Sequence, residues 1–552
     1  MKYYIAIFLT SVLSFTSLAQ TKATNNINPD KPKLVVGVVV DQMRYDYLTR
    51  FWDKYGEDGF KRLISEGFNL KNHHFNYIPT YTAPGHTSVF TGATPRSHGI
   101  ISNSWYDKFE KKYVYCVSDD EVQPVGTINS AGKMSPTRML ATSIADENRL
   151  FTQMRGKTIG IALKDRGAIL PAGHTANAAY WFHGQDEGNW ISSDFYMDKL
   201  PLWVEDFNSS GKKLEYMKSW EPIQPIETYV ESGVDENQFE TGFNGKEKPT
   251  FPYDLKKLGK ENGNYDLLKV TPFGNSLTAD FAIAAIKGEQ LGQDEFTDFL
   301  TLSFSSTDYV GHNFGVNSKE IEDTYLRLDL DLARLLTNLD EQVGEGNYTL
   351  FLTADHGGVD VPSYLTSIKI PSGYFDDVEF EKDLNQFLFK KYEKEDLLES
   401  VSNYQVFFNY RAIVDAEIDR HVLEENIAHF ILQYPKVNRV FTRDQLESGT
   451  YQDGISALVQ NGFNQKRSGD VVFVLDPAVI SYTTTTGSTH GSGFSYDTHA
   501  PLIFFGKGIQ HGNTSVRSQV VDIAPTIAVL LGISFPNSNT GEPLKGVLEN
   551  KD

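Results

Sequence analysis

The stretch Leu34-Val35-Val36-Gly37-Val38-Val39-Val40-Asp41 decides the fold of this chain. It is a short, continuous apolar run, rich in β-branched residues, and it ends on a carboxylate. Runs of this kind are typical of strands that are buried on both faces of a parallel sheet. The stretch therefore predicts a buried parallel strand with Asp41 just beyond its carboxyl end.

Further runs extend this pattern along the chain. Residues 299–304, 348–352 and 501–505 are predicted strands, and residues 57–66 are a predicted helix that stops at Gly67. Another helix is expected to begin after Asp522, which would cap it, and to end at Gly532. After residue 318, one helical stripe is apolar and consists of Ile321, Tyr325, Leu328, Leu332, Leu335, Leu336 and Leu339.

Alternating strands and helices predict an α/β fold, a mostly parallel central sheet with helices on both faces. Residues 363–470, here called the cap, break this alternation because they are charge-rich and mix short strands at 404–414 with a helix at 424–433. The cap is predicted to be an insertion. Residues 185–270 form a second polar elaboration.

Composition limits the classes of function. The chain has 552 residues, of which 40% are hydrophobic, and a formal net charge of −21. Such an acidic protein repels nucleic acid at long range, so we expect no nucleic-acid partner. An anionic substrate would be repelled too, so a site for one must be made locally positive by metal ions or by a few cations.

The N-terminus reads as a signal peptide over residues 1–19. Lys2 supplies the positive start, residues 4–15 the apolar stretch, and Ser17-Leu18-Ala19 the cleavage site, which leaves residues 20–552 as the mature chain. The alternative is a membrane anchor, but the apolar run is shorter than the ~20 residues that span a bilayer. We expect a periplasmic or secreted protein without stable membrane association, and a monomer. Cys116 is the single cysteine, which excludes an intramolecular disulfide.

Carboxylates and histidines follow the predicted strands or lie in glycine-rich loops. Asp308 and His312 are spaced i, i+4, which places both on one face of a helical turn. Both residue types are zinc ligands, although an ion pair or a capped turn explains the spacing equally well. Since the carboxyl ends of parallel strands meet at one sheet edge, we expect the candidate ligands to converge there. The full candidate set is Asp41, Asp308, His312, Asp355, His356 and His490.

A hydroxyl and several polar groups complete the constellation. Thr82 precedes Pro84, which is predicted to lie in the first turn of a helix ending at Thr91, so the hydroxyl would sit where anions bind. The alternative is that Thr82 is only a helix cap. Lys164 and Arg166 would share a face in an extended segment and match a dianionic phosphoryl group, or form a solvated pair. Asn103 is either a donor to that group or a turn residue.

Together these motifs resemble the alkaline phosphatase superfamily, and within it the phosphate-irrepressible periplasmic enzymes that use threonine. The resemblance rests on Val-Asp-Gln-Met-Arg at 40–44, Pro-Thr-x-Thr-x-Pro-Gly-His at 79–86, Leu-Lys-Asp-Arg at 163–166, Ser-Thr-Asp-Tyr-Val-Gly-His at 306–312, Ala-Asp-His-Gly at 354–357 and Thr-His at 489–490. It implies the fold of that superfamily over nearly all of the mature chain.

The resemblance also implies an activity and the roles of residues. It implies two Zn²⁺ ions, one held by Asp308, His312 and His490 and the other by Asp41, Asp355 and His356, with Thr82 as nucleophile and metal contact. Phosphate monoesters would pass through a phosphothreonine intermediate, with Asn103, Lys164 and Arg166 on the phosphoryl oxygens. No magnesium site is expected.

Two other classes of function stay open at this stage. A phosphodiesterase, nucleotide pyrophosphatase or sulfatase of the same superfamily would share the metal ligands. The Lys-x-Arg pair at 164–166 favours monoesters, because the phosphodiesterase branch lacks it, and the stretch Thr82-Ala83-Pro84-Gly85 does not match the sulfatase motif. A non-catalytic exported binding protein is the remaining alternative.

Overall fold

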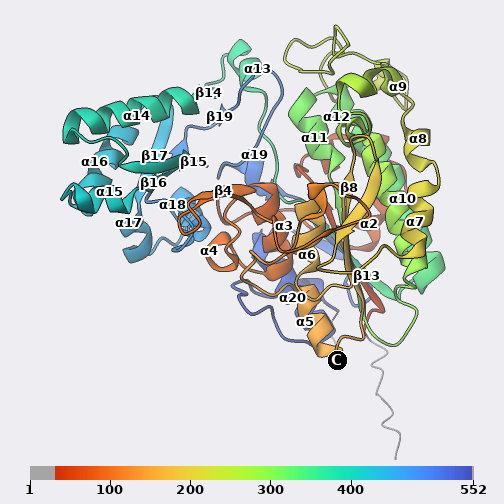
Figure 1. Ribbon diagram of the computed structural model, residues 1–552. Coiled ribbons are helices and arrows are strands. Elements are labelled where there is room, and N and C mark those ends of the chain that lie inside the picture. The colour runs from red at the N-terminus through yellow and green to blue at the C-terminus, as the bar shows by residue number, and fades with distance from the viewer. Residues whose placement is uncertain (1–30, 550–552) are drawn as a thin grey trace, which may run out of the picture.

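The computed structural model describes residues 31–549, and the expected signal peptide at residues 1–19 lies outside them. Within the described chain, ten strands form one central sheet, ordered β22-β2-β21-β13-β1-β12-β7-β8-β9-β6 (Figure 1). The decisive stretch is β1 (Leu34–Val40), all of whose residues are buried. It pairs in parallel with β12 (Asp298–Phe304) and β13 (Tyr348–Thr353). The predicted buried parallel strand is confirmed.

The parallel core of the sheet continues on one side, and antiparallel pairs occur toward both margins, although the outermost pair β2–β22 is parallel. β12, β7 (Thr158–Ala162) and β8 (Ala178–His183) pair in parallel. By contrast, β21 (Leu502–Gly506), predicted from residue 501, runs antiparallel to β13. The expected α/β class is confirmed as a mixed sheet. Its outer strands are β9 (Asn189–Ser193), β6 (Pro124–Val125), β2 (Phe68–Leu70) and β22 (Gly512–Thr514).

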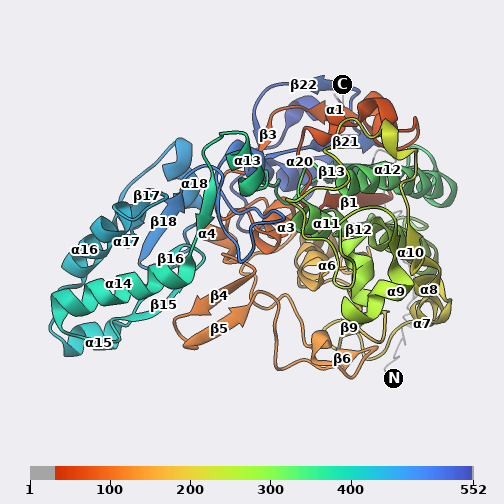
Figure 2. The same cartoon turned by 90° about the horizontal axis from the view of Figure 1, so that it is seen from above.

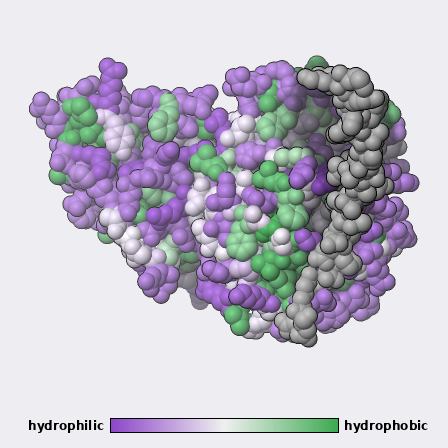
Figure 3. Space-filling view, turned by 90° about the horizontal axis from the view of Figure 1, so that it is seen from below, coloured by the Kyte–Doolittle hydropathy of each residue, from purple (hydrophilic) through white to green (hydrophobic). Residues whose placement is uncertain are grey.

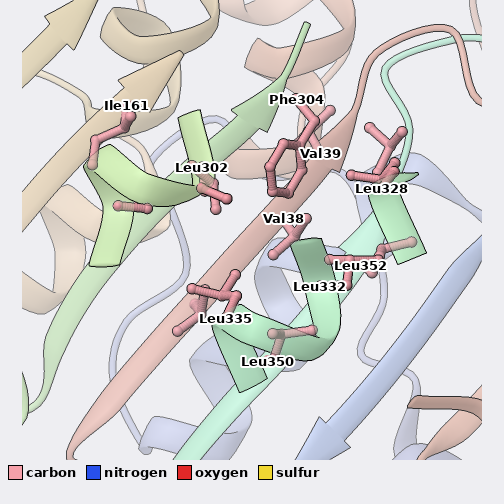
Figure 4. Close-up of a cluster of buried hydrophobic side chains, with 14 of the residues drawn as sticks. Val38, Val39, Ile161, Leu302, Phe304, Leu328, Leu332, Leu335, Leu350 and Leu352 are labelled. Carbon is pink, nitrogen blue, oxygen red and sulfur yellow. The ribbon is translucent and has the colours of Figure 1, made fainter. Parts of the chain in front are cut away.

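Helices cover both faces of the sheet (Figure 2). α10 (Pro272–Gly288) and α12 (Lys319–Leu339) lie on one face. α3 (Thr82–Thr91), α6 (Asp165–Ala172) and α20 (Ile523–Leu531) lie on the other. Every residue of the predicted stripe on α12 is buried. Figure 4 shows why: Leu328, Leu332 and Leu335 face the side chains of Val38 and Leu350 on the central strands.

The cap contains most of a separate four-stranded sheet, ordered β15-β16-β18-β17. β15 (Leu398–Ser402), β16 (Gln405–Phe408) and β17 (Val437–Thr442) lie within residues 363–470, and β18 (Val471–Leu475) follows directly. With α14 (Asp377–Tyr392) and α16 (Arg420–Leu432) these strands enclose their own buried apolar cluster. Figure 3 shows a mainly hydrophilic surface over this part of the molecule, on the left.

The strand expected over residues 404–414 is wrong in its second half. β16 ends at Phe408, and α15 (Tyr410–Asp415) follows as a helix. The side chain of Asn409 accepts a hydrogen bond from the backbone N–H of Ala412, at 3.2 Å, so it caps α15 and ends the strand.

Two predicted helix starts also need correction. The helix expected over 57–66 is α2 (Phe60–Glu66), and the carboxylate of Asp329 on α12 accepts its first N–H at 2.8 Å. Asp522 precedes α20 but does not cap it, because its carboxylate accepts instead from the backbone N–H groups of Gln519 and Glu542. Among residues 31–549, no helix has both the length and the apolar character that a membrane crossing needs.

Candidate active site

Four neighbouring parallel strands end at the candidate site. Asp355, Asp41, Asp308 and Lys164 follow β13, β1, β12 and β7 respectively, and the side chains of all four are buried. Parallel strands bring their carboxyl ends to one edge of a sheet, so residues far apart in sequence meet there. The structure therefore brings these four groups together at one edge of the sheet, as predicted.

Lys164 lies inside the carboxylate cluster. Its Nζ atom is 2.7 Å from Asp41 Oδ2 and 2.5 Å from Asp308 Oδ2. The segment expected to be extended turns instead: Lys164 is the last extended residue before α6, and Arg166 is within the helix. The two cations therefore have different partners: Lys164 contacts the aspartates, and Arg166 donates to the hydroxyl of Tyr115 at 3.0 Å.

The predicted histidine ligands share one geometry. In each of them Nδ1 contacts a backbone carbonyl oxygen, so the ring can donate from Nδ1 and keep the Nε2 lone pair free for a metal. The partners are Ser488 at 2.7 Å for His312, Gly357 at 2.9 Å for His356 and Thr80 at 2.7 Å for His490. Each Nε2 atom is directed at a carboxylate, at 3.1 Å for His312 to Asp308 and 3.5 Å for His356 to Asp41.

These donors form two overlapping groups that can hold metal ions. Asp308, His312 and His490 bring one donor atom each within 4.8 Å of one another. Asp41, Asp308 and His356 do the same, while Asp355 Oδ2 lies 3.4 Å from His356 Nε2. Within the described residues, three buried atoms of this site have no hydrogen-bond partner: Asp41 Oδ1, Asp355 Oδ2 and His356 Nε2. Buried ligand atoms that lack hydrogen-bond partners are typical of a site that a metal ion completes.

Burial and mutual charge set the protonation of the aspartates. Burial, with the neighbouring charge of Asp355, raises the pKa of Asp41 well above its ordinary value, although Lys164 opposes this. Burial also opposes ionisation of Asp308, but His312 and Lys164 outweigh it and hold the pKa of that carboxyl well below its usual range. Neighbouring carboxylates thus differ strongly in their tendency to ionise, as is common at functional sites.

Thr82 is the first residue of α3 and its hydroxyl faces this cluster. The α3 helix runs to Thr91, as predicted, and Pro84 lies in its first turn. Tyr81, not Thr82, occupies the cap position, and its side chain makes no capping hydrogen bond with any described residue, so the capping role that was the alternative for Thr82 is not seen. Among residues 31–549, Lys164 Nζ is the one hydrogen-bond partner of Thr82 Oγ1, at 3.5 Å.

Two further predicted phosphate-binding residues have donors to spare: Asn103, which contacts the residue after Thr82, and Arg166, which contacts Tyr115. The Asn103 side-chain oxygen accepts the backbone N–H of Ala83 at 2.8 Å, which leaves its NH₂ group as a donor. Arg166 Nη1 donates to Tyr115, whose hydroxyl donates to Asp165 at 2.5 Å. The buried Nε atom of Arg166 has no hydrogen-bond partner in the part of the chain that the structure describes. Asn103 therefore keeps its NH₂ group, next to the start of α3, and Arg166 keeps its Nε–H as an unused donor.

Two residues of this site were not selected from the sequence. Gln42 donates from Nε2 to Asp308 at 2.8 Å and from its backbone N–H to Asp355 at 3.1 Å. His86 contacts the Thr82 carbonyl oxygen at 2.9 Å and Asp355 Oδ2 at 3.2 Å. The available signal was their place in the motifs, Gln42 directly after Asp41 and His86 one helical turn after Thr82.

Comparison with known proteins agrees with this architecture. The type I phosphodiesterase / nucleotide pyrophosphatase family matches residues 35–497. A Myroides odoratus protein named calcium-transporting ATPase is 48% identical, covering 97% of both chains. Alkaline phosphatase PafA of Elizabethkingia meningoseptica is 43% identical over 98% of both chains, and alkaline phosphatase PhoV of Synechococcus elongatus is 42% identical over 96%.

Solved structures show the same fold. The crystal structure of alkaline phosphatase PafA superposes with a TM-score of 0.90, covering 94% of this chain and 99% of that one. A human ectonucleotide pyrophosphatase / phosphodiesterase 5 structure superposes with a TM-score of 0.52 at 14% identity, over 94% of this chain and all of that one. The second likeness concerns the fold alone.

Proposed function

The chain belongs to the type I phosphodiesterase / nucleotide pyrophosphatase family, and on that premise we propose that it is an alkaline phosphatase, which hydrolyses phosphate monoesters to an alcohol and inorganic phosphate. Relatives named alkaline phosphatase are 43% and 42% identical over nearly the whole chain. The observation that carries the proposal is the setting of Thr82, whose hydroxyl lies 3.5 Å from Lys164 and beside two metal-competent donor groups.

Two zinc ions are the proposed cofactors. Asp308, His312 and His490 would hold one ion, and Asp41, Asp355 and His356 the other. When bound, zinc lowers the pKa of a coordinated hydroxyl or water and stabilises a developing alkoxide. The unpartnered atoms and the shared Nδ1 geometry of the histidines support this assignment.

Thr82 is the proposed nucleophile. Its Oγ1 atom loses its proton and attacks phosphorus in line, the ester P–O bond breaks, and the alcohol leaves with a proton. Water then cleaves the phosphothreonine, releasing phosphate and restoring the hydroxyl. Lys164 lies beside the attacking oxygen, and the free donors of Arg166 and Asn103 would hold the non-reacting oxygens as charge builds on them.

The pair of cations favours monoesters over diesters. A monoester presents a dianionic phosphoryl group, which Lys164 and Arg166 together can neutralise, whereas a diester carries one charge fewer. Diester, nucleotide or sulfate hydrolysis is the second candidate because the family includes phosphodiesterases. The terminal phosphate of ATP is also dianionic, so ATP belongs among the test substrates.

We further infer that the protein is exported to the periplasm or the medium and acts as a monomer on small-molecule phosphate esters. The basis is the leader-like pattern of residues 1–19 and the net charge of −21, which disfavours nucleic acid. Fractionation of cells expressing the full chain and N-terminal sequencing of the product test export. A mature chain that keeps residues 1–19 would contradict it.

Purified protein tested on an aryl phosphate monoester, the matching diester, the matching sulfate and ATP separates the candidate functions. We expect the monoester to have the highest kcat/KM. Thr82→Ala should lower turnover by ~10³-fold or more while zinc content and phosphate binding persist, because only the attacking oxygen is lost. A diester preference, or full turnover by the variant, would overturn the assignment.

A further inference from the structure

A small hairpin carries Asn103 at its base. β4 (Ser104–Asp107) and β5 (Lys112–Tyr115) pair in antiparallel fashion and form a two-stranded sheet apart from the central one. Asn103 directly precedes β4, and its backbone oxygen accepts the N–H of Cys116 at 2.9 Å, which closes the hairpin. Because no central strand pairs with this hairpin, its position depends on side contacts.

One side chain of the cap supplies such a contact on both sides of Asn103. Asn403 lies in the tight turn between β15 and β16, with φ of 52°. Ser102 donates from Oγ to Asn403 Oδ1 at 3.0 Å, and Asn403 Nδ2 donates to the Ser104 carbonyl oxygen at 2.8 Å. A single amide thus holds the residues before and after Asn103.

Neighbouring cap residues hold the outer part of the same hairpin. Tyr106 donates to Glu399 at 2.7 Å, and the Tyr113 and Ser400 hydroxyls lie 2.5 Å apart. These contacts join β15 to the hairpin along its length. Asn103, meanwhile, has its side-chain oxygen committed to α3, so the direction of its NH₂ group depends on where its backbone is held.

We propose that Asn403 is a positioning residue for phosphoryl transfer, which holds Asn103 so that its NH₂ group meets a phosphoryl oxygen of the substrate. The inference rests on the proposed function. It gives the cap a part in catalysis: the cap braces one donor of the phosphate-binding region from a distance, through the hairpin. Small displacements of such donors weaken transition-state stabilisation strongly, because each hydrogen bond depends on the distance between the donor and the phosphoryl oxygen.

A double-mutant cycle tests the proposal. Asn403→Gly removes the amide and keeps the positive φ, which glycine adopts without strain. We expect roughly a 10-fold fall in kcat/KM for an aryl phosphate monoester, with zinc content unchanged. In an Asn103→Ala background the same change should alter kcat/KM by less than ~2-fold, since the donor that Asn403 positions is already gone.

Asn426→Ala is the matched control, because Asn426 is a cap asparagine that donates to Tyr392 inside the cap, at 2.8 Å, and does not touch the hairpin. It should leave kcat/KM near the wild-type value. Normal turnover by Asn403→Gly, or equal losses in both backgrounds, would overturn the inference alone. Absence of monoester turnover by the unmodified enzyme would refute the proposed function, and the inference with it.

Discussion

Gln42 illustrates how one uncharged residue can organise several charged ones. Its backbone has φ of 64°, a left-handed conformation that non-glycine residues adopt rarely and mostly for a reason. In this conformation its N–H reaches Asp355 while its side-chain amide reaches Asp308. Gly311 leaves the room for that amide, since a Cβ there would lie 1.9 Å from Gln42 Oε1. The backbone strain therefore orients a carboxylate from each of the two metal-competent groups.

Removing the Gln42 amide should weaken metal retention more than it weakens folding. Gln42→Leu keeps the bulk but leaves Asp308 Oδ1 without its amide donor, and losing such a supporting bond typically costs ~10–100-fold in metal affinity. Zinc release to a chromogenic chelator measures this directly, alongside kcat/KM. Gln510→Leu, which alters an amide that donates to the Leu548 carbonyl oxygen, is the control. Equal release rates for both variants would show that Gln42 does not support the ligands.

Helix α3 shows how an element can be shaped by a site. Gly85 lies one turn into the helix, where a Cβ would fall 2.3 Å from the Asp355 carbonyl oxygen. The missing side chain lets α3 approach the end of β13, so that Thr82 and Asp355 belong to one site. The sequence predicted the bounds of α3 well because Pro84 and the following residues act locally, whereas the contact with Asp355 is not local.

Helix α12 carries buried carboxylates that the proposed mechanism does not use. Glu320 lies in its first turn, fully buried, and accepts from Tyr253 at 2.6 Å. Burial raises its pKa from 4.5 to about 8. Burial, with the neighbouring charge of Glu320, raises the pKa of Glu240 from 4.5 to about 11. Neither carboxylate oxygen of Glu240 has a hydrogen-bond partner among residues 31–549.

This pair should make the protein less stable as pH rises. The folded chain holds protons that the unfolded chain releases above pH 4.5. Folding therefore loses stability between about pH 4.5 and 8 from Glu320, and between about pH 4.5 and 11 from Glu240. In the double variant Glu240→Gln/Glu320→Gln, neither of these two side chains can ionise. Its Tm should match wild type near pH 5 and exceed it by ~2–4 °C at pH 8.5, measured with zinc in fixed excess. A Tm difference that does not change with pH would contradict this account.

The whole molecule shows which features a sequence can reveal. Apolar runs and helical stripes were sufficient to predict β1, β12, β13 and β21 of the central sheet and the buried face of α12, since both patterns reflect burial that is repeated along the chain. The other strands of the sheet were not predicted. The Asp308–His312 spacing was likewise readable, because α11 (Ser306–Phe314) is a local structure. Contacts between residues far apart in the chain could not be predicted from the sequence. Asp329 caps α2 from 269 residues away, and Asn403 reaches Ser102 across 301 residues.

The cap shows the same limit at the largest scale. Its composition marked it as different from the rest of the chain, but β18 extends its sheet just past residue 470. Its contact with the β4–β5 hairpin depends on how two distant units meet, which no local pattern encodes. The fold of the catalytic part was therefore easier to predict than the part the cap plays in it.

Stability of the whole molecule should depend on the metal ions. Asp41, Asp308 and Asp355 converge in a buried region. Lys164 contacts Asp41 and Asp308. Folding therefore concentrates negative charge, and two bound metal ions would reduce the resulting repulsion. A strong chelator should abolish monoester turnover and lower Tm, and added Zn²⁺ should restore both. A ligand present at 100 times its Kd stabilises the folded protein by about 2.7 kcal/mol, so the shift in Tm is measurable.

Thr82→Ala, which leaves the aspartate and histidine ligands intact, should show the same Tm shift without turnover. Chelation that changes neither quantity would refute the proposed zinc sites.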